Sequence, residues 1–149
     1  MVHWTEYISP IGIPIIAAIA AWIAFRQFQI ARNKLKLDLF DKRMEVYTAV
    51  REALGNITRQ GNLTQEQQLQ YLQGIRTARW LFGKDVFTYL DETLWHKIVD
   101  LEMHNELSKD PSDPERIKHV RARTETFRWM SAQYREFDAL VAKYLELRH

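Results

Sequence analysis

Hydrophobic and polar positions change their spacing once along the chain, near residue 25. From Tyr7 to Phe25, 19 consecutive residues carry no charged side chain. A helix of that length extends roughly 28 Å, close to the ~30 Å thickness of a bilayer's hydrocarbon core. The run therefore predicts one membrane-spanning helix. Pro14 leaves two alternatives open, because it either kinks this helix or marks its start, which would shorten the span.

After residue 25 the pattern becomes amphipathic and remains helical. Hydrophobic residues recur at three- and four-residue steps, which predicts that the first helix continues to about Ile57. Thr64 and Gln67 form a capping-box pattern that opens a second helix, ending at Gly83. Asp85 is the expected cap of a third helix. A linker with two prolines follows, and Asp113 with Pro114 opens the last helix.

These elements predict an all-α protein, in which an N-terminal transmembrane helix continues into a small cytosolic helical bundle of about four helices. Only five glycines and four prolines occur in the chain, which agrees with long helices. We expect two parts: residues 1–32, a periplasmic N-terminus with the transmembrane helix, and residues 33–149, a cytosolic helical domain.

Charge on the two sides of the apolar run predicts its orientation. Glu6 is the only charged side chain in residues 1–25, whereas four basic residues follow the run: Arg26, Arg32, Lys34 and Lys36. Basic residues favour the cytoplasmic side, so the N-terminus should face outward, and in a bacterial protein the bundle should lie in the cytoplasm at the inner membrane. The four basic residues are expected to contact lipid headgroups. A cleaved signal peptide is disfavoured, because no Lys or Arg precedes Arg26.

Small residues repeat within the predicted span. Ala17 and Ala21, like Ala20 and Ala24, lie four positions apart, and such surfaces let membrane helices approach closely. We therefore expect these four alanines to pack against another copy of the chain, which predicts a homo-oligomer.

The net charge of +2 conceals an uneven distribution. Residues 85–113 contain eight acidic and two basic side chains, whereas residues 114–149 contain eight basic and five acidic ones. Arg121, Arg128 and Arg135 recur every seven residues and form one stripe. We favour a solvated or helix-pairing face for this stripe, with anion binding as the alternative. No nucleic-acid motif accompanies it, so no nucleic-acid partner is expected.

One constellation in the third helix resembles a reactive or metal-binding site: Glu92, His96, Asp100 and His104 recur every four residues. Each step drifts by about 40° on a 3.6-residue helix, so all four side chains cannot meet one ion on a regular helix. We favour an exposed acidic face with local pairs. No catalytic residue, metal site or cofactor is predicted, and the absence of cysteine excludes thiol chemistry.

The second helix carries Arg76 and Arg79 beside its apolar stripe. One of them is expected to be partly buried and paired with an acidic residue of the first helix, as a structural clamp. Aromatic residues make up 12% of the chain. Core packing is the favoured role of Trp80, Trp95 and Trp129, with subunit or partner contacts as the alternative.

After the predicted anchor the chain carries the pattern Lys-Leu-x-Leu-Asp-Leu-Phe-x-Lys-Arg, followed by three further segments: Val46-Tyr47, Arg76–Phe82 and Tyr89–Asp91. With this pattern and these segments the chain resembles a widespread group of short bacterial single-anchor membrane proteins of uncharacterised function. The resemblance implies a bacterial source, an N-terminal anchor and a cytosolic helical domain. It implies no activity, cofactor or catalytic residue.

The sequence thus favours a non-enzymatic, membrane-tethered interaction protein, a homo-oligomeric scaffold or adaptor at the inner membrane. Its expected partners are the lipid bilayer, further copies of the chain and an unidentified cytosolic protein. The alternative is an oligomeric membrane effector or channel-like protein, gated by its cytosolic domain in stress or phage defence. An enzyme that uses the third helix is the least favoured hypothesis.

Overall fold

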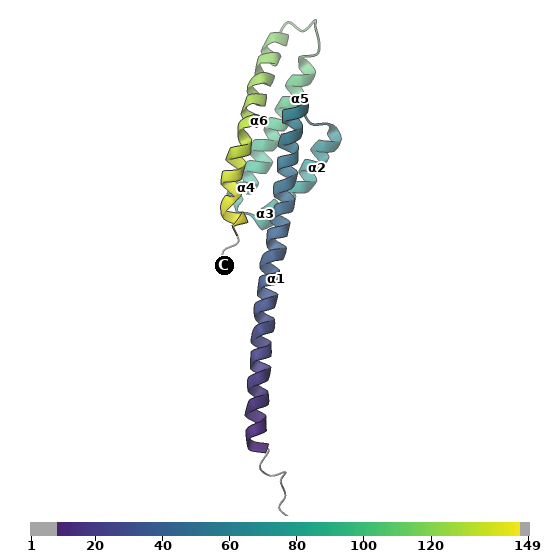
Figure 1. Ribbon diagram of the computed structural model, residues 1–149. Helices are drawn as coiled ribbons and strands as arrows, with labels where there is room; N and C mark the ends of the chain where they lie inside the picture. Colours follow the sequence, from purple (N-terminus) through teal and green to yellow (C-terminus); the bar gives the residue numbers. More distant parts are fainter. Residues whose placement is uncertain (1–8, 147–149) are drawn as a thin grey trace, which may run out of the picture. The chain divides into compact units, whose positions relative to one another are not determined.

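A computed structural model describes the chain over residues 9–146, with side chains from residue 13 onward. Within these residues the structure is all-α, as predicted, and contains no strand (Figure 1). Glu6 and Tyr7, on which the orientation and the start of the apolar run depend, lie outside the described residues. The elements are α1 (Ser9–Gln60), α2 (Gln65–Ile75), α3 (Ala78–Leu81), α4 (Lys84–Thr88), a π-helical segment (Tyr89–Leu94), α5 (Trp95–Leu107) and α6 (Arg116–Leu145).

The chain divides into two compact units, residues 1–38 and 39–149, and α1 contributes to both. The boundary predicted from the sequence, between the membrane segment and the helical domain, lies six residues earlier, after residue 32. Within the first unit, α1 begins at Ser9, so Pro10 lies in its first turn and Pro14 lies inside the helix. A helix that starts only at Ile13 is therefore not the arrangement found. Proline in a helix interior removes one backbone hydrogen bond.

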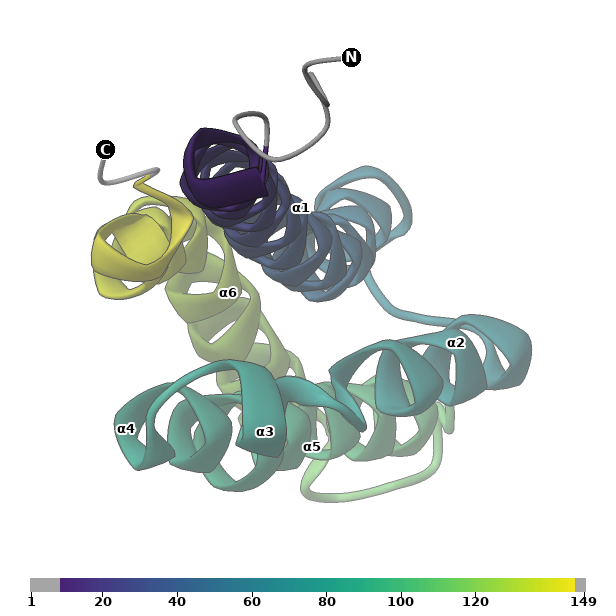
Figure 2. The same cartoon turned by 90° about the horizontal axis from the view of Figure 1, so that it is seen from below.

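The second unit is a bundle in which the later part of α1 packs with α2, α5 and α6. An end-on view shows these helices around a common interior (Figure 2). That interior is formed mainly by aliphatic side chains, with Tyr71 and Phe137 as its largest fully buried residues. The four predicted helices account for this bundle, although two of them are divided into shorter pieces.

Three rings extend the core between helices. Tyr47 of α1, Phe137 of α6 and Tyr89 of the π segment are stacked in order, with centroid distances of 5.7 and 6.3 Å. The Tyr47 hydroxyl donates to Asp138 at 2.9 Å, and the Tyr89 hydroxyl donates to Gln133 at 2.7 Å. The stack therefore packs its rings together while each outer ring satisfies its polar end.

Helix ends follow the sequence where a local cap decides them. Thr64 and Gln67 form the predicted capping box, with bonds of 3.0 Å and 3.3 Å. Gly61, the residue after α1, has a φ of 84°, and its N–H reaches the Ile57 carbonyl at 2.8 Å. Only glycine takes that conformation without strain, so the chain turns there.

Between residues 75 and 84 the helix ends differ from those predicted from the sequence. The predicted second helix stops at Ile75, and a turn separates it from α3. The next helix begins at Lys84, with Gly83 rather than Asp85 at the cap position. The Asp85 carboxylate instead binds Lys143 at 3.0 Å and accepts the Tyr144 hydroxyl at 3.2 Å. The bond from Lys143 holds the pKa of Asp85 below its usual value. Asp85 thus contacts α6 and does not cap the helix as expected.

The last helix begins two residues later than predicted, at Arg116. Asp113 nevertheless accepts the Glu115 N–H through its side chain at 2.8 Å, and its carbonyl accepts the Arg116 N–H at 3.1 Å. The first turn is thus wound more tightly than an α-helix, which explains the shift of the boundary.

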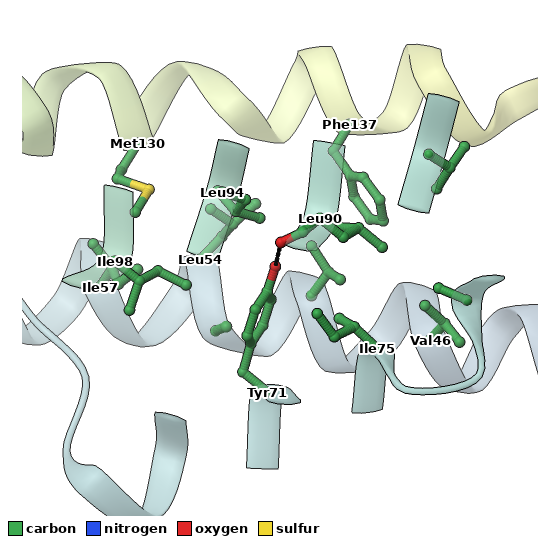
Figure 3. Close-up of a cluster of buried hydrophobic side chains, with 14 of the residues drawn as sticks. Val46, Leu54, Ile57, Tyr71, Ile75, Leu90, Leu94, Ile98, Met130 and Phe137 are labelled. Atoms are coloured by element: carbon green, nitrogen blue, oxygen red, sulfur yellow. Dashed lines mark hydrogen bonds between the residues drawn. The ribbon is translucent and has the colours of Figure 1, made fainter. Parts of the chain in front are cut away.

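Tyr71 joins α2 to the π segment in the middle of the core. Its hydroxyl donates to the Leu90 carbonyl at 2.8 Å, and this carbonyl also accepts the Trp95 N–H (Figure 3). A carbonyl oxygen has two lone pairs and can serve both donors. Trp95 stacks on Tyr71 at a centroid distance of 6.1 Å. The buried hydroxyl is thereby satisfied.

Replacement of Phe137 by alanine should destabilise the bundle by about 3–5 kcal/mol, because it removes the middle ring of the stack and leaves a cavity. Phe137 is 0% exposed, whereas Ile117 on the same helix is 78% exposed. Ile117→Ala is therefore the matched control and should change stability by no more than about 0.5 kcal/mol. Denaturant unfolding of the detergent-solubilised chain measures both, and equal effects would contradict this assignment of the core.

Stability should fall in alkaline solution. Burial raises the pKa of Tyr71 and of Tyr89 above the usual value, so their protonated forms stabilise the fold below about pH 10 and this contribution is lost as the pH rises further. Tyr71→Phe should lower stability at neutral pH by about 1 kcal/mol and reduce the alkaline loss. Unfolding curves between pH 7 and strongly alkaline pH test this. An unchanged alkaline slope in Tyr71→Phe would refute it.

Candidate functional site

The first candidate site is the apolar part of α1. One helix in the described residues, within Ile13–Gln60, is long and apolar enough to cross a membrane by length and composition. None of its most apolar window is buried, whereas a core helix of a soluble protein would be mostly buried. Exposed isoleucine, tryptophan and phenylalanine side chains continue along it. A contiguous exposed apolar surface of this size is typical of a membrane or protein contact.

Small residues gather on one side of that helix. Ala17, Ala20, Ala21 and Ala24 are all exposed. At about 100° per residue, they fall within an arc of roughly 100°, so the predicted small face is a single strip. Ile19 lies on the opposite side of the helix. The strip allows a second helix to approach closely, and Ile19 provides a matched position on the far face.

The four basic residues that follow the apolar run are exposed as well. They are Arg26, Arg32, Lys34 and Lys36. The Arg26 guanidinium lies over the Trp22 ring, 5.4 Å from its centroid. An arginine beside an exposed tryptophan is a pair typical of the headgroup level of a bilayer.

Arg43 of α1 forms the structural clamp, a role that the sequence analysis assigned to Arg76 or Arg79 of the second helix. Its Nε donates to the Leu81 carbonyl at 2.8 Å and its Nη1 donates to the Tyr144 carbonyl at 2.7 Å. Its guanidinium also lies over the rings of Phe82 and Tyr144. One side chain of α1 thus binds the C-terminal ends of both α3 and α6.

The clamp prediction for Arg76 and Arg79 is therefore wrong. Both side chains are exposed, and Arg79 lies 5.6 Å from the centroid of Trp80. Trp80 is itself 82% exposed, unlike Trp95, which stacks on Tyr71, and Trp129, which packs on the core. Together with exposed Lys84, these residues form a basic, aromatic surface around α3, which we call the α3 surface: Arg76, Arg79, Trp80 and Lys84.

The arginine stripe on α6 stays in solvent. Arg121, Arg128 and Arg135 are exposed, and none of them forms an ion pair with a residue in the described part of the chain. Seven-residue spacing keeps them on one face. The stripe thus offers three separate cations along one face of α6.

The constellation on the third predicted helix does not come together. His96 bonds to the Glu92 carbonyl, and Asp100 pairs with Lys97 at 3.8 Å. His104 instead faces His119 of α6, a residue that the sequence analysis did not single out. A signal was available: His104 and His119 lie at equal distances along the chain from the middle of the proline-containing linker, and such positions meet in a helical hairpin.

A shallow groove lies between α1 and α2. Its lining includes Glu52, Asn56, Gln67 and Gln70, together with the edge of Tyr71. Close packing limits its depth, because a Cβ added at Gly74 would lie 2.4 Å from the Ala49 Cβ. The groove brings one carboxylate together with amides, which bind by hydrogen bonds but provide no nucleophile and base pair.

Loss of the Arg43 clamp should destabilise the bundle by about 2 kcal/mol in Arg43→Gln, since hydrogen bonds from a charged group to carbonyls are lost. Arg43→Lys should recover little, because one ammonium group cannot serve both carbonyls in the geometry of a guanidinium. Lys42→Gln is the control, since Lys42 forms only an exposed pair with Glu45. Denaturation, with hydrogen exchange at residues 78–82 and 140–145, checks this. Exchange equal to the wild type in Arg43→Gln would contradict it.

Comparisons with known proteins add no relative. No model of a protein family matches the chain, and no significant match occurs among curated proteins or among solved structures. The arguments for function therefore come from the surfaces described above: the apolar face of α1, the α3 surface and the arginine stripe.

Proposed function

We propose that this chain is a non-enzymatic, membrane-tethered interaction protein. In this proposal α1 anchors it in the inner membrane of a bacterium, with the N-terminus outside and residues 39–149 in the cytoplasm. Copies associate through the small face of α1, and the bundle presents a helical surface to a cytosolic partner. The observation that carries the proposal is the apolar window of α1, of which no part is buried by the protein itself.

The energetic argument concerns the exposed side chains of this window. Each fully exposed large aliphatic side chain costs roughly 1.5–3 kcal/mol relative to burial. Ile13, Ile16, Ile19 and Ile23 are all exposed, together with Trp22 and Phe25. A bilayer removes this cost for the entire segment at once. Cationic Arg26, Arg32 and Lys34 follow in sequence, where an anionic leaflet attracts them at about 1 kcal/mol each.

Association of copies is supported by the small face. Helices in lipid gain little from the hydrophobic effect, so they associate by close van der Waals packing, which alanine permits. The four-alanine strip supplies such a face, whereas the opposite side carries Ile19 and Trp22, which favour contact with lipid. A partner contact is supported by Trp80, since exposed tryptophan and arginine are enriched at interface hot spots.

Cysteine cross-linking in bacterial membranes tests this proposal, because the chain contains no cysteine of its own. Ala21→Cys should form a disulfide-linked dimer on mild oxidation, as the face brings two copies together. Ile19→Cys, on the opposite side, is the matched control and should remain monomeric. Ala21→Leu should weaken association in nanodiscs by about 1–3 kcal/mol through overpacking, measured as a loss of oligomer mass.

Three outcomes would contradict the proposal. One is a soluble chain recovered from the cytosol without membranes. A second is a monomer in nanodiscs over the accessible concentration range. A third is equal cross-linking at positions 19 and 21, which would show that contact is random rather than on the alanine face. An ion conductance that appears with the oligomer would identify the chain as a channel-like effector and not as a scaffold.

A further inference from the structure

Two histidines face each other where α5 and α6 are joined. The linker between these helices lies at the end of the bundle opposite α3 and the C-terminal end of α6 (Figure 1). There the Nδ1 atoms of His104 and His119 are 3.3 Å apart, with ring centroids at 5.5 Å and an angle of 32° between the rings. His119 is only 16% exposed. Two imidazole nitrogens thus lie within hydrogen-bond distance of each other between two helices.

The separation of these nitrogens matches a metal site. Zinc binds histidine nitrogen at ~2.0–2.1 Å in tetrahedral geometry, which places two such nitrogens about 3.3–3.4 Å from each other. The observed 3.3 Å lies at that value. An ion could therefore bind both rings with little movement of either helix.

A carboxylate stands on the remote side of His119. The Oδ2 atom of Asp113 lies 3.7 Å from His119 Nε2, the nitrogen that does not face His104. Metal-binding histidines usually direct their other ring nitrogen to a carboxylate, which fixes the tautomer and orients the ring. Asp113 is itself fixed, because its side chain accepts the Glu115 N–H at 2.8 Å.

Neighbouring hydrogen bonds hold the two helices at this spacing. Arg116 Nε donates to the Ser108 carbonyl at 3.0 Å, and Arg123 donates to Asn105 Oδ1 at 3.1 Å. Both bonds link α5 or its C-terminal end with the beginning of α6. The two imidazoles are consequently set in place before any ion binds, which lowers the cost of binding.

We infer that His104 and His119 form a binding site for a divalent transition-metal ion, with Asp113 as the residue that orients His119. Imidazole nitrogen suits Zn²⁺, Cu²⁺ and Ni²⁺. No group of three or more metal-binding side chains occurs in the described residues, so the protein supplies two ligands and solvent completes the coordination. The ion would join α5 and α6 and stabilise the hairpin. This inference is independent of the proposed membrane function.

Zinc titration of the full chain in nanodiscs tests the site, using a purification tag that lacks histidine. The chain has five histidines, and His3 and His149 are removed in the background variant. We expect one Zn²⁺ per chain by calorimetry, and a tetrahedral absorption spectrum when Co²⁺ replaces Zn²⁺. Zinc should raise the melting temperature. His104→Ala and His119→Ala should each lower the affinity at least tenfold and abolish the thermal shift.

Two further variants separate metal binding from an imidazole–imidazole hydrogen bond. Asp113→Asn should lower the affinity by about 10–100-fold, as a residue that positions a ligand does. His96→Ala, on the same helix as His104, should leave the zinc affinity unchanged. Far-UV circular dichroism confirms that each variant is folded. Absence of zinc binding in the background variant, or equal affinity in His104→Ala and His96→Ala, would overturn the inference.

Discussion

The bond from the Tyr71 hydroxyl to the Leu90 carbonyl is the contact on which the arrangement of the bundle depends. Tyr71 is 1% exposed, and a hydroxyl buried to that degree destabilises the fold unless it finds a partner. It finds one inside the core, at a carbonyl that the π segment already uses for Trp95. The Leu90 carbonyl therefore joins α2 to the place at which the third predicted helix widens.

The π segment explains how residues spaced four apart can all be buried, which a regular α-helix would not allow. Val86, Leu90, Leu94 and Ile98 are all buried, although steps of four residues drift by about 40° each on an α-helix and by about 120° over three steps. A π turn holds more residues than an α turn and reduces this drift. The core face stays continuous because the helix changes its pitch. The sequence analysis predicted no π segment; the four-residue steps of Val86, Leu90, Leu94 and Ile98 are the signal that could have indicated it.

Sequence reasoning succeeded where a residue and its neighbours determine the structure. The capping box of Thr64 and Gln67 needs only a four-residue segment, and the helical class follows from spacing. It failed where distant contacts decide, as for Asp85, whose carboxylate binds Lys143 of α6, and for the break after Ile75. The candidate site shows the same division. The position of the four alanines on one strip of α1 follows from spacing alone, and their role in helix packing stays a prediction, whereas the contact between His104 and His119 depends on how a hairpin closes.

The arginines illustrate why charge along the sequence does not reveal its role. Arg43, Arg76 and Arg79 all lie near apolar stripes, but only Arg43 meets the unpaired carbonyls at two helix C-termini. Those carbonyls carry partial negative charge and lack partners within their own helices, so a guanidinium that reaches both stabilises two ends at once. Arg76 and Arg79 then remain in solvent beside Trp80. Of these three arginines, the bundle thus uses Arg43 for its own stability and leaves Arg76 and Arg79 exposed on its surface.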